Sequence, residues 1–446
     1  MMVSPAIMSE YFDRLWPILR SLTGEGVRRT HDILSEVIPL ERLEIPSGTA
    51  VFDWEVPKEW VVRDAYVIDP NGRRILDIWE NNLRLINYSV PYTGTITKSE
   101  LEEHLYSIPE LPDAIPYVTS YYTPRWGFCL SQRERDSLPE GEYQVVIDAE
   151  HIDGSMTLGE AVLPGQVQSE VLLSTYTCHP SMAHNELSGP LVVAFLYQRL
   201  AALENRRLTY RFVFLPETIG SIAYLSLRGD HLRECLAAGY VVTCVGDSGA
   251  LTYKRSRRGD TVADRAAAHV LSHYGGIQSK AVDFFPNDGG DERQYCSPGF
   301  NLPVGSLTRT MYSQYPEYHT SLDNKDFISF ESMCQTVDIY YQIMMTLELN
   351  RSFQNLMPFG EPQLGKRGLI STLGGRGRSG AEETAAIRWL LNYSDGEHDL
   401  LQISERSGVP MVLLSDVAQR CVDAGLLAPI ELISQASAPD RRIDLP

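Results

Sequence analysis

Apolar and polar positions change their period along the chain, and the clearest pattern runs from residue 171 to about residue 350. Short β-branched and aromatic runs alternate there with longer stretches whose apolar residues recur at helical spacing. The predicted elements are Val171–Thr177, Leu191–Leu203, Thr209–Leu215, Ile219–Leu227, Tyr240–Val245, Thr261–Tyr274, Leu302–Thr308 and Phe327–Leu349. Strands that alternate with helices form largely parallel sheets. The sequence therefore predicts an α/β domain, with a mostly parallel sheet and helices on both faces.

Segments before and within this domain have other periods. Ser9–Leu22 and Gly24–Leu34 have the spacing of two short amphipathic helices, whereas residues 50–165 show the two-residue alternation of strands and frequent turn signals. We therefore predict that residues 1–49 and 166–355 form the α/β domain around an inserted β-rich domain, residues 50–165.

The last part of the chain contains three short helical patterns and a β-like tail. The patterns Glu382–Tyr393, Leu400–Ser407 and Pro410–Ala424 follow a connector rich in proline and glycine, which we expect to be mobile. Together they predict a winged helix-turn-helix over residues 365–446. Residues 361–446 contain nine Lys and Arg against twelve Asp and Glu. Because this segment has few cations that could bind DNA phosphates, we expect it to be a protein-contact or dimerisation module and not a DNA reader. We also expect a homo-oligomer.

Composition narrows the class of protein. With 39 Lys and Arg against 58 Asp and Glu, the formal net charge is -19 at pH 7, which argues against a nucleic-acid partner. The chain has neither a signal-like N-terminus nor a run of 18 apolar residues, so we expect a cytoplasmic protein without a membrane partner. Its seven cysteines include no Cys-x-x-Cys pair, which indicates reduced thiols.

Four predicted strands are followed by a residue that can bind a metal or move a proton. In chain order these residues are His179, Glu217, Asp247 and His319. The carboxyl ends of parallel strands meet at one edge of a sheet, where ligands bind. Taken singly, a strand-end histidine is more often structural, and a strand-end carboxylate is more often a helix cap. Because each of four strands is followed by such a residue, the four together indicate a zinc site in which one carboxylate remains free to act as a general base.

These residues resemble the ordered metal-site motifs of the zinc aminopeptidase family with paired metals, of the zinc exopeptidase clan. The resemblance rests on His179, Asn185-Glu-Leu-Ser-Gly189, Pro216-Glu217-Thr-Ile-Gly220, Asp247 and Tyr318-His319-Thr. It covers most of the chain and is closest to a bacterial aminopeptidase-like branch with an inserted β domain and a C-terminal winged helix. The resemblance implies that His179 and Asp247 bind one zinc, that Glu217 is the general base and that His319 is the last ligand.

Two positions depart from the family pattern. Asn185 stands where the family has a carboxylate that bridges both metals, and Thr218 stands where it has a second glutamate. A neutral amide and a hydroxyl cannot offset two dications that lie about 3.5–4 Å apart. We therefore predict one zinc per chain, held by His179, Asp247 and His319 with water as the fourth ligand. Asn185 would add only a weak carbonyl oxygen or a supporting hydrogen bond.

Residues near these motifs have alternative interpretations. His184 is either a substitute ligand or, as we favour, a loop histidine exposed to solvent. Cys178 is either a nucleophile or soft ligand or, as we favour, a buried thiol. Glu186 either binds a substrate amine or caps a helix. Arg293 either clamps a substrate carboxylate or forms an ion pair with Asp291.

Three tyrosines near His319, at positions 312, 315 and 318, either line the pocket or pack in the core. The predicted substrate-binding residues are Glu186, Asp291, Arg293, Tyr315 and Tyr318. We predict a zinc-dependent hydrolase of an amide or peptide bond next to a free amino group, aminopeptidase-like, whose substrate is a small peptide or an aminoacyl amide. The alternative is a non-catalytic ligand-binding or regulatory protein with a degenerate metal site.

Overall fold

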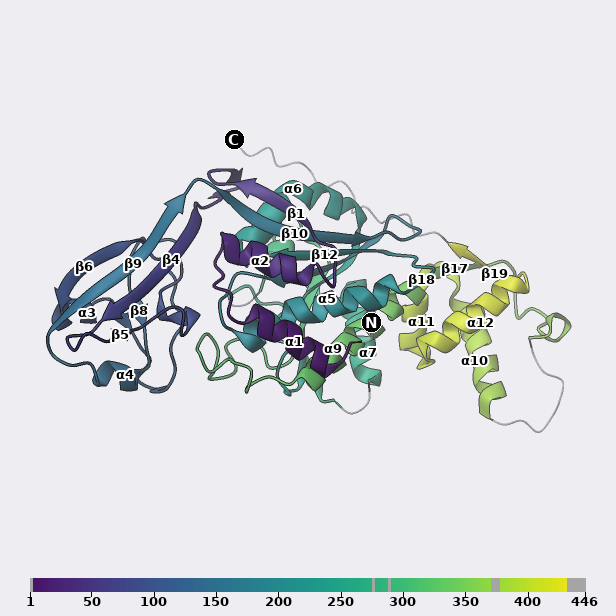
Figure 1. The fold of residues 1–446 in the computed structure, drawn as a ribbon. Helices are drawn as coiled ribbons and strands as arrows, with labels where there is room; N and C mark the ends of the chain where they lie inside the picture. The colour runs from purple at the N-terminus through teal and green to yellow at the C-terminus, as the bar shows by residue number, and fades with distance from the viewer. Residues whose placement is uncertain (1–2, 275–276, 288–289, 370–377, 431–446) are drawn as a thin grey trace. The chain divides into compact units, whose positions relative to one another are not determined.

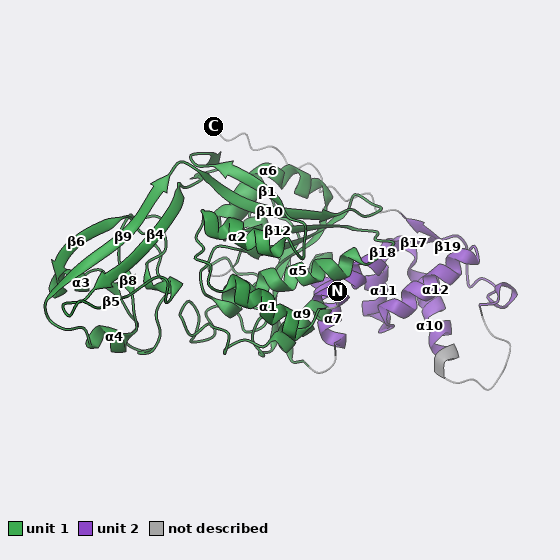
Figure 2. Cartoon of the chain, in the orientation of Figure 1, with its two compact units in different colours: residues 1–263, 275–339 green, residues 264–274, 340–446 purple. Residues whose placement is uncertain are grey.

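The computed structural model describes residues 3–274, 277–287, 290–369 and 378–430. Its chain divides into two units, coloured separately in Figure 2. Unit 1 comprises residues 1–263 and 275–339, and unit 2 comprises residues 264–274 and 340–446. Among the described residues, every helix is too short or too polar to span a bilayer.

The main sheet of unit 1 has eight strands in the order β1-β10-β12-β11-β13-β16-β14-β15. In that order they are Glu41–Pro46, Ser155–Leu163, Thr209–Leu215, Glu170–Tyr176, Leu236–Val241, Val304–Thr308, Leu251–Lys254 and Ser279–Val282. The four central strands, β12, β11, β13 and β16, are parallel to one another. Antiparallel pairings join β1 to β10, β10 to β12 and β14 to β16. The predicted mostly parallel sheet is confirmed, and each antiparallel pairing involves a flanking strand, β1, β10 or β14.

Strand β11 lies at the centre of this sheet, and all seven of its residues are buried. A strand covered on both faces must be apolar on both, which explains its continuous β-type sequence. Leu172 belongs to the core cluster of helix α6 (Ile219–Cys235). Helix α5 (Ser188–Ala201) approaches so closely that a Cβ atom at Gly189 would lie 2.3 Å from the Val242 carbonyl oxygen. Figure 1 shows α5 and α6 on opposite sides of the sheet.

The N-terminal segment differs in part from its prediction. Helices α1 (Pro5–Leu15) and α2 (Glu25–Leu34) are present, but residues 17–22, predicted as helical, are not. Pro17 explains the difference, because proline cannot donate the backbone hydrogen bond that would continue the helix. The non-helical residues that follow bring Arg20 next to the His179 loop.

Within residues 50–165, residues 59–152 build a second, four-stranded sheet in the order β5-β4-β9-β6, whereas β10 belongs to the main sheet. Its strands are Arg74–Ile75, Glu59–Ile68, Glu142–Ile152 and Tyr92–Thr97. They pack over their own core, which includes Trp60, Phe128 and Tyr143. Residues 115–121 of this segment lie outside the sheet and hydrogen-bond to the loop that carries His319, from Tyr117 N to the His319 carbonyl oxygen at 2.8 Å.

Unit 2 includes a three-stranded sheet in the order β18-β17-β19 and the helices α10, α11 and α12, in addition to parts of α7 (Val262–His273) and α9 (Phe330–Leu349). The strands are Asp395–Asp399, Ser352–Asn355 and Leu427–Ile430, and the helices α10, α11 and α12 are Arg378–Tyr393, Leu400–Ser407 and Met411–Asp423. Asp399 and Gln402 form a capping box that starts α11, and Gly408 ends it in the left-handed conformation. Part of the predicted connector, residues 370–377, and the tail after residue 430 lie outside the described residues.

Candidate active site

The predicted site residues emerge from four neighbouring strands of the main sheet. Three of them, His179, Glu217 and Asp247, follow β11, β12 and β13, and His319 follows β16. These are the four mutually parallel strands, so their carboxyl ends lie along one edge of the sheet. The strand order therefore explains how residues 140 positions apart in sequence share one region.

A cavity of about 260 Å³ at this edge is lined by His179, Glu217 and His319. The His179 Nε2 atom lies 3.6 Å from Glu217 Oε2, and the His179 and His319 ring centroids are 5.4 Å apart. The remaining lining residues are Leu22, Tyr117, Thr119, Tyr121, Tyr122, Cys178, Thr218 and Ile219. Asp247 is not among the described residues that line this cavity.

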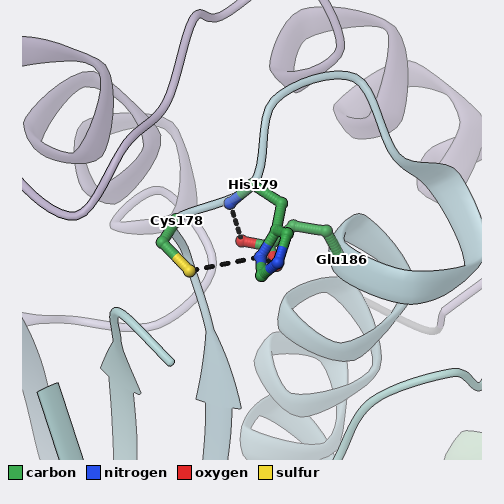
Figure 3. Close-up of side chains that lie close together, drawn as sticks. All are labelled: Cys178, His179 and Glu186. Atoms are coloured by element: carbon green, nitrogen blue, oxygen red, sulfur yellow. Dashed lines mark hydrogen bonds and ion pairs between the residues drawn. The ribbon is translucent and has the colours of Figure 1, made fainter. Parts of the chain in front are cut away.

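His179 is held from behind by Glu186, as Figure 3 shows. One carboxylate oxygen of Glu186 accepts from the His179 backbone N–H at 2.9 Å, and the other lies 2.9 Å from Nδ1. The buried Arg20 guanidinium donates to the His179 carbonyl oxygen at 2.8 Å. Because Nδ1 is engaged, Nε2 is the nitrogen left to face Glu217. A histidine oriented by a carboxylate in this way is the usual arrangement of a metal ligand.

Glu186 was predicted to contact substrate, and its side chain is fully buried against His179. Cys178, Glu186 and His179 lie close enough together to hold a metal ion by themselves. Burial raises the pKa of the Cys178 thiol to about 11, so without a metal this thiol is protonated at neutral pH. The contacts of Glu186 favour a supporting role for that residue. Both oxygens of Glu186 already accept hydrogen bonds from His179.

The buried atoms near the site that have no hydrogen-bond partner among the described residues include His319 Nε2 and Asn185 Oδ1, and also Asp291 Oδ2 and Arg293 Nε. Burial, together with the neighbouring His179, lowers the pKa of His319 to about 3, which keeps its ring neutral. A neutral imidazole nitrogen and an amide oxygen without partners are suitable metal ligands. These two atoms would therefore suit a zinc ion, although the close group of potential ligand side chains among the described residues is Cys178, His179 and Glu186, without Asp247 or His319.

His184 is fully buried, so the expectation that it is exposed to solvent is wrong. Its Nδ1 atom accepts from the backbone N–H groups of Gly246 and Asp247 at 3.0 and 2.9 Å, and its Nε2 atom donates to the Thr310 carbonyl oxygen at 2.8 Å. Both ring nitrogens are thus used to fix the loop that carries Asp247. The Thr310 hydroxyl also donates to the Asp247 carboxylate.

The turn that carries Asn185 is fixed by Asp323, a residue that sequence reasoning did not single out. Its two carboxylate oxygens accept from the backbone N–H groups of His184 and Asn185 at 2.6 and 2.9 Å. Asp323 lies four residues after His319. The His319 loop and the Asn185 turn are therefore held together.

Glu217 lies at the start of α6, beside a strained residue. Burial raises its pKa above the usual range, with Glu186 adding to the effect and His179 opposing it. Thr218 has φ 65°, a conformation that a β-branched residue rarely adopts. Its backbone N–H donates to Asp291 Oδ1 at 2.7 Å, and its hydroxyl accepts from Arg293 Nη2 at 3.1 Å.

Positive φ angles recur around the site, at Ser181 (43°), Cys244 (49°) and His319 (56°) in addition to Thr218. Strained backbone conformations of this kind persist where the surrounding contacts hold them in place, and they cluster at functional sites.

Asp291 and Arg293, which we predicted to bind substrate, both contact Thr218. No ion pair joins them to each other within the described part of the chain.

The tyrosines near His319 lie around the cavity rather than in its described lining. Tyr315 is buried with its ring 4.9 Å from that of His184, and Tyr318 stacks on His319 with centroids 3.9 Å apart. The Tyr312 hydroxyl accepts from buried Lys254 at 3.0 Å. The tyrosines that line the cavity, Tyr117, Tyr121 and Tyr122, come from the inserted segment.

Comparison with known proteins identifies relatives over nearly the whole chain. A family model described as a domain of unknown function, DUF4910, matches residues 9–350, and a winged helix-turn-helix model matches residues 351–429. A Clostridium acetobutylicum protein, named for a provisional role in polysaccharide biosynthesis and for an aminopeptidase-like domain, is 47% identical over 397 residues, which cover 89% of this chain and 90% of that protein.

Solved structures agree with this assignment. A crystal structure from Clostridium acetobutylicum, provisionally named as a peptidase, has 43% identity and a TM-score of 0.87 over 96% of both chains. The Bacillus subtilis zinc aminopeptidase BSAP has 12% identity and a TM-score of 0.55, over 77% of this chain and 93% of its own, which shows the fold alone. The predicted zinc exopeptidase-like fold and winged helix are confirmed, and the predicted metal ligands and base stay predictions. The chain therefore belongs to the DUF4910 family, as an aminopeptidase-like protein with a C-terminal winged helix-turn-helix.

Proposed function

We propose that this protein is a zinc-dependent hydrolase of an amide or peptide bond next to a free amino group. The observation that carries the proposal is that His179, Glu217 and His319 line one cavity at the carboxyl ends of parallel strands. Glu186 orients His179 toward that cavity. A structural zinc is closed off by four protein ligands, whereas a catalytic one keeps an open position. A zinc ion with fewer than four protein ligands beside a cavity would therefore be catalytic and not structural.

The zinc would be held by His179 and His319 through nitrogen and by Asp247 through an anionic oxygen. The unpartnered His319 Nε2 and Asn185 Oδ1 support this assignment. When bound, zinc supplies Lewis acidity to the attacking water and the scissile carbonyl. We expect one ion, since Asn185 offers no charge to bridge a pair.

Glu217 is the proposed general base. Its raised pKa suits a carboxylate that must accept a proton near neutral pH and then release it. A Glu217 oxygen takes one proton from the attacking water as the oxygen adds to the carbonyl carbon. The same carboxyl then protonates the leaving nitrogen, and the C–N bond breaks to give a carboxylic acid and an amine.

The substrate we propose is an aminoacyl amide of small-molecule biosynthesis. The name of the Clostridium acetobutylicum relative, which refers to polysaccharide biosynthesis, supports a biosynthetic amide over a dietary or regulatory peptide. The small volume of the cavity, about 260 Å³, also supports a short substrate.

A ligand-binding or regulatory protein with a degenerate metal site is the second candidate. The residues that favour it are Asn185 and Thr218, which replace two carboxylates of the resembled family. Against it, the part-exposed carboxylate of Glu217, with its raised pKa and its position beside His179, suits proton transfer.

The hydrolase proposal is tested with a panel of aminoacyl amides and dipeptides. We expect the zinc-loaded protein to hydrolyse at least one of them. Dialysis against a chelator should lower turnover by about 100-fold or more, and one equivalent of zinc should restore it, because the metal activates the water. Turnover that survives complete metal removal, or no hydrolysis of any panel member, would contradict the proposal.

We also propose that the winged helix is a protein-contact module that supports a homo-oligomer. In α12, Arg420 is already paired with Glu383 at 2.9 Å, which leaves little positive charge for phosphate. We expect sedimentation of the full chain to show an oligomer, and titration with labelled duplex DNA to show no binding at about micromolar concentration. Salt-sensitive binding at that concentration would contradict this proposal.

A further inference from the structure

One wall of the candidate active site belongs to the inserted β domain. Residues 115–121 form an isolated antiparallel bridge, Pro116 to Thr320, next to His319. The Tyr117 ring lies beside both histidines, with its centroid 5.1 Å from that of His179 and 5.4 Å from that of His319. A substrate group next to Tyr117 would therefore lie beside the proposed metal ligands.

The hydroxyl of Tyr117 takes part in a chain of hydrogen bonds whose direction can be deduced. Asn87 Nδ2 donates to the Arg20 carbonyl oxygen at 2.8 Å, which identifies the other atom of this amide as Oδ1. The Tyr121 hydroxyl donates to that oxygen at 3.1 Å. The same Asn87 oxygen also accepts from the Ser21 hydroxyl. A phenol has one proton, so while Tyr121 donates to Asn87 it accepts from Tyr117, whose oxygen lies 2.8 Å away.

The direction of this chain limits what Tyr117 can offer a ligand. Its proton is committed to Tyr121, so only a lone pair of its oxygen remains. Both phenols keep their proton at neutral pH, because a tyrosine hydroxyl ordinarily ionises only at about pH 10. Tyr117 is therefore a neutral hydrogen-bond acceptor at the cavity, and it suits a substrate group that donates.

Other lining residues favour a cationic donor. Glu217 is the only carboxylate among the described residues that line the cavity, and the proposed mechanism uses it for proton transfer. The rings of Tyr117, Tyr121 and Tyr122 line the same wall. Aromatic faces attract ammonium groups. A protonated amine would thus meet a phenol lone pair, aromatic faces and the charge of Glu217.

We propose that Tyr117 determines specificity for the free amino group of the substrate, by accepting a hydrogen bond from it. Tyr121 and Asn87 position the acceptor by holding its proton. The inference rests on the proposed amide hydrolysis and adds the residue that recognises the amine. In this account the inserted β domain supplies substrate selection, while the α/β domain supplies the metal ligands and the base.

The test compares leucinamide, alaninamide and phenylalaninamide with their N-acetyl derivatives. For wild type we expect hydrolysis of a free-amine form only. Tyr117→Phe should raise KM for that substrate about 10- to 100-fold with kcat nearly unchanged, as loss of a hydrogen bond to a charged group predicts. Tyr121→Phe should also raise KM, because it releases the proton of Tyr117. Tyr106→Phe, the matched control, removes a phenol oxygen from the same packing cluster outside the cavity lining and should change neither constant.

Calorimetric binding of the same amides to the zinc-loaded Glu217→Gln variant separates this inference from the proposed reaction. If wild type hydrolyses none of them but binds a free-amine form, and Tyr117→Phe weakens that binding, amine recognition stands and the hydrolase proposal falls. An unchanged KM and an unchanged affinity in Tyr117→Phe would overturn the inference while leaving hydrolysis intact. Equal acceptance of N-acetylated amides by wild type would overturn it too, as would no binding of any free amine.

Discussion

Replacement of Glu217 by glutamine is expected to abolish most of the turnover while the fold and the metal remain. Glutamine has nearly the same shape but cannot accept a proton, and general-base catalysis is worth about 100- to 10,000-fold in rate. The measurement is kcat for a hydrolysed amide, together with zinc content and thermal unfolding. Because Glu217 is not one of the proposed ligands, the variant should retain its zinc.

The same change at Glu103, which is exposed on the inserted domain, is the matched control and should leave kcat unchanged. If Glu217→Gln hydrolyses its substrate at the wild-type rate, Glu217 is not the base. If it loses zinc as well as activity, the residue is a ligand instead. The zinc content of an inactive Glu217→Gln variant distinguishes a base, which leaves the zinc bound, from a ligand, which does not.

Removal of the His179 side chain is expected to release the zinc. His179 contributes a nitrogen that Glu186 and Arg20 hold in place from behind. Replacing a residue that only orients a ligand costs about 10- to 100-fold in metal affinity. We therefore expect a loss in this range for Glu186→Gln and a larger loss for His179→Ala. Competition with a chelator of known affinity measures both.

His273→Ala is the control for this series, since His273 is exposed on α7 (Val262–His273). It should keep its zinc. Both His179→Ala and Glu186→Gln alter buried positions, so circular dichroism of the metal-free proteins must show that each variant is folded. A folded His179→Ala protein with wild-type zinc affinity would remove His179 from the site.

The sequence predicted the architecture around the candidate site because the relevant signals are local. Each of His179, Glu217 and Asp247 follows a buried apolar run, and the parallel order of those runs brings their ends together. Pro17 was also a local signal, and it should have ended the helix that we predicted over residues 9–22. It stops that helix and leaves Arg20 free to reach the His179 loop.

Long-range contacts account for what the sequence could not predict. His184 lies in a polar stretch of sequence that looks like an exposed loop. Its two ring nitrogens nevertheless hydrogen-bond to residues more than 60 positions away. The role of Asp323 depends on two loops that meet only in the fold. Tyr117 lies in a segment without regular structure, and only its contact with the His319 loop places it at the cavity. The three tyrosines among residues 117–122 were the available signal in the sequence.

Zinc content per chain, measured by elemental analysis of the purified protein, tests the central claim most directly. The claim is that His179, Asp247 and His319 form a single catalytic metal site in which Asn185 cannot bridge a pair. It predicts close to one zinc per chain, with no further uptake when zinc is added in excess. Two tightly held ions per chain would contradict the single site, and no zinc in a folded protein with all three ligands intact would contradict the metal-dependent account.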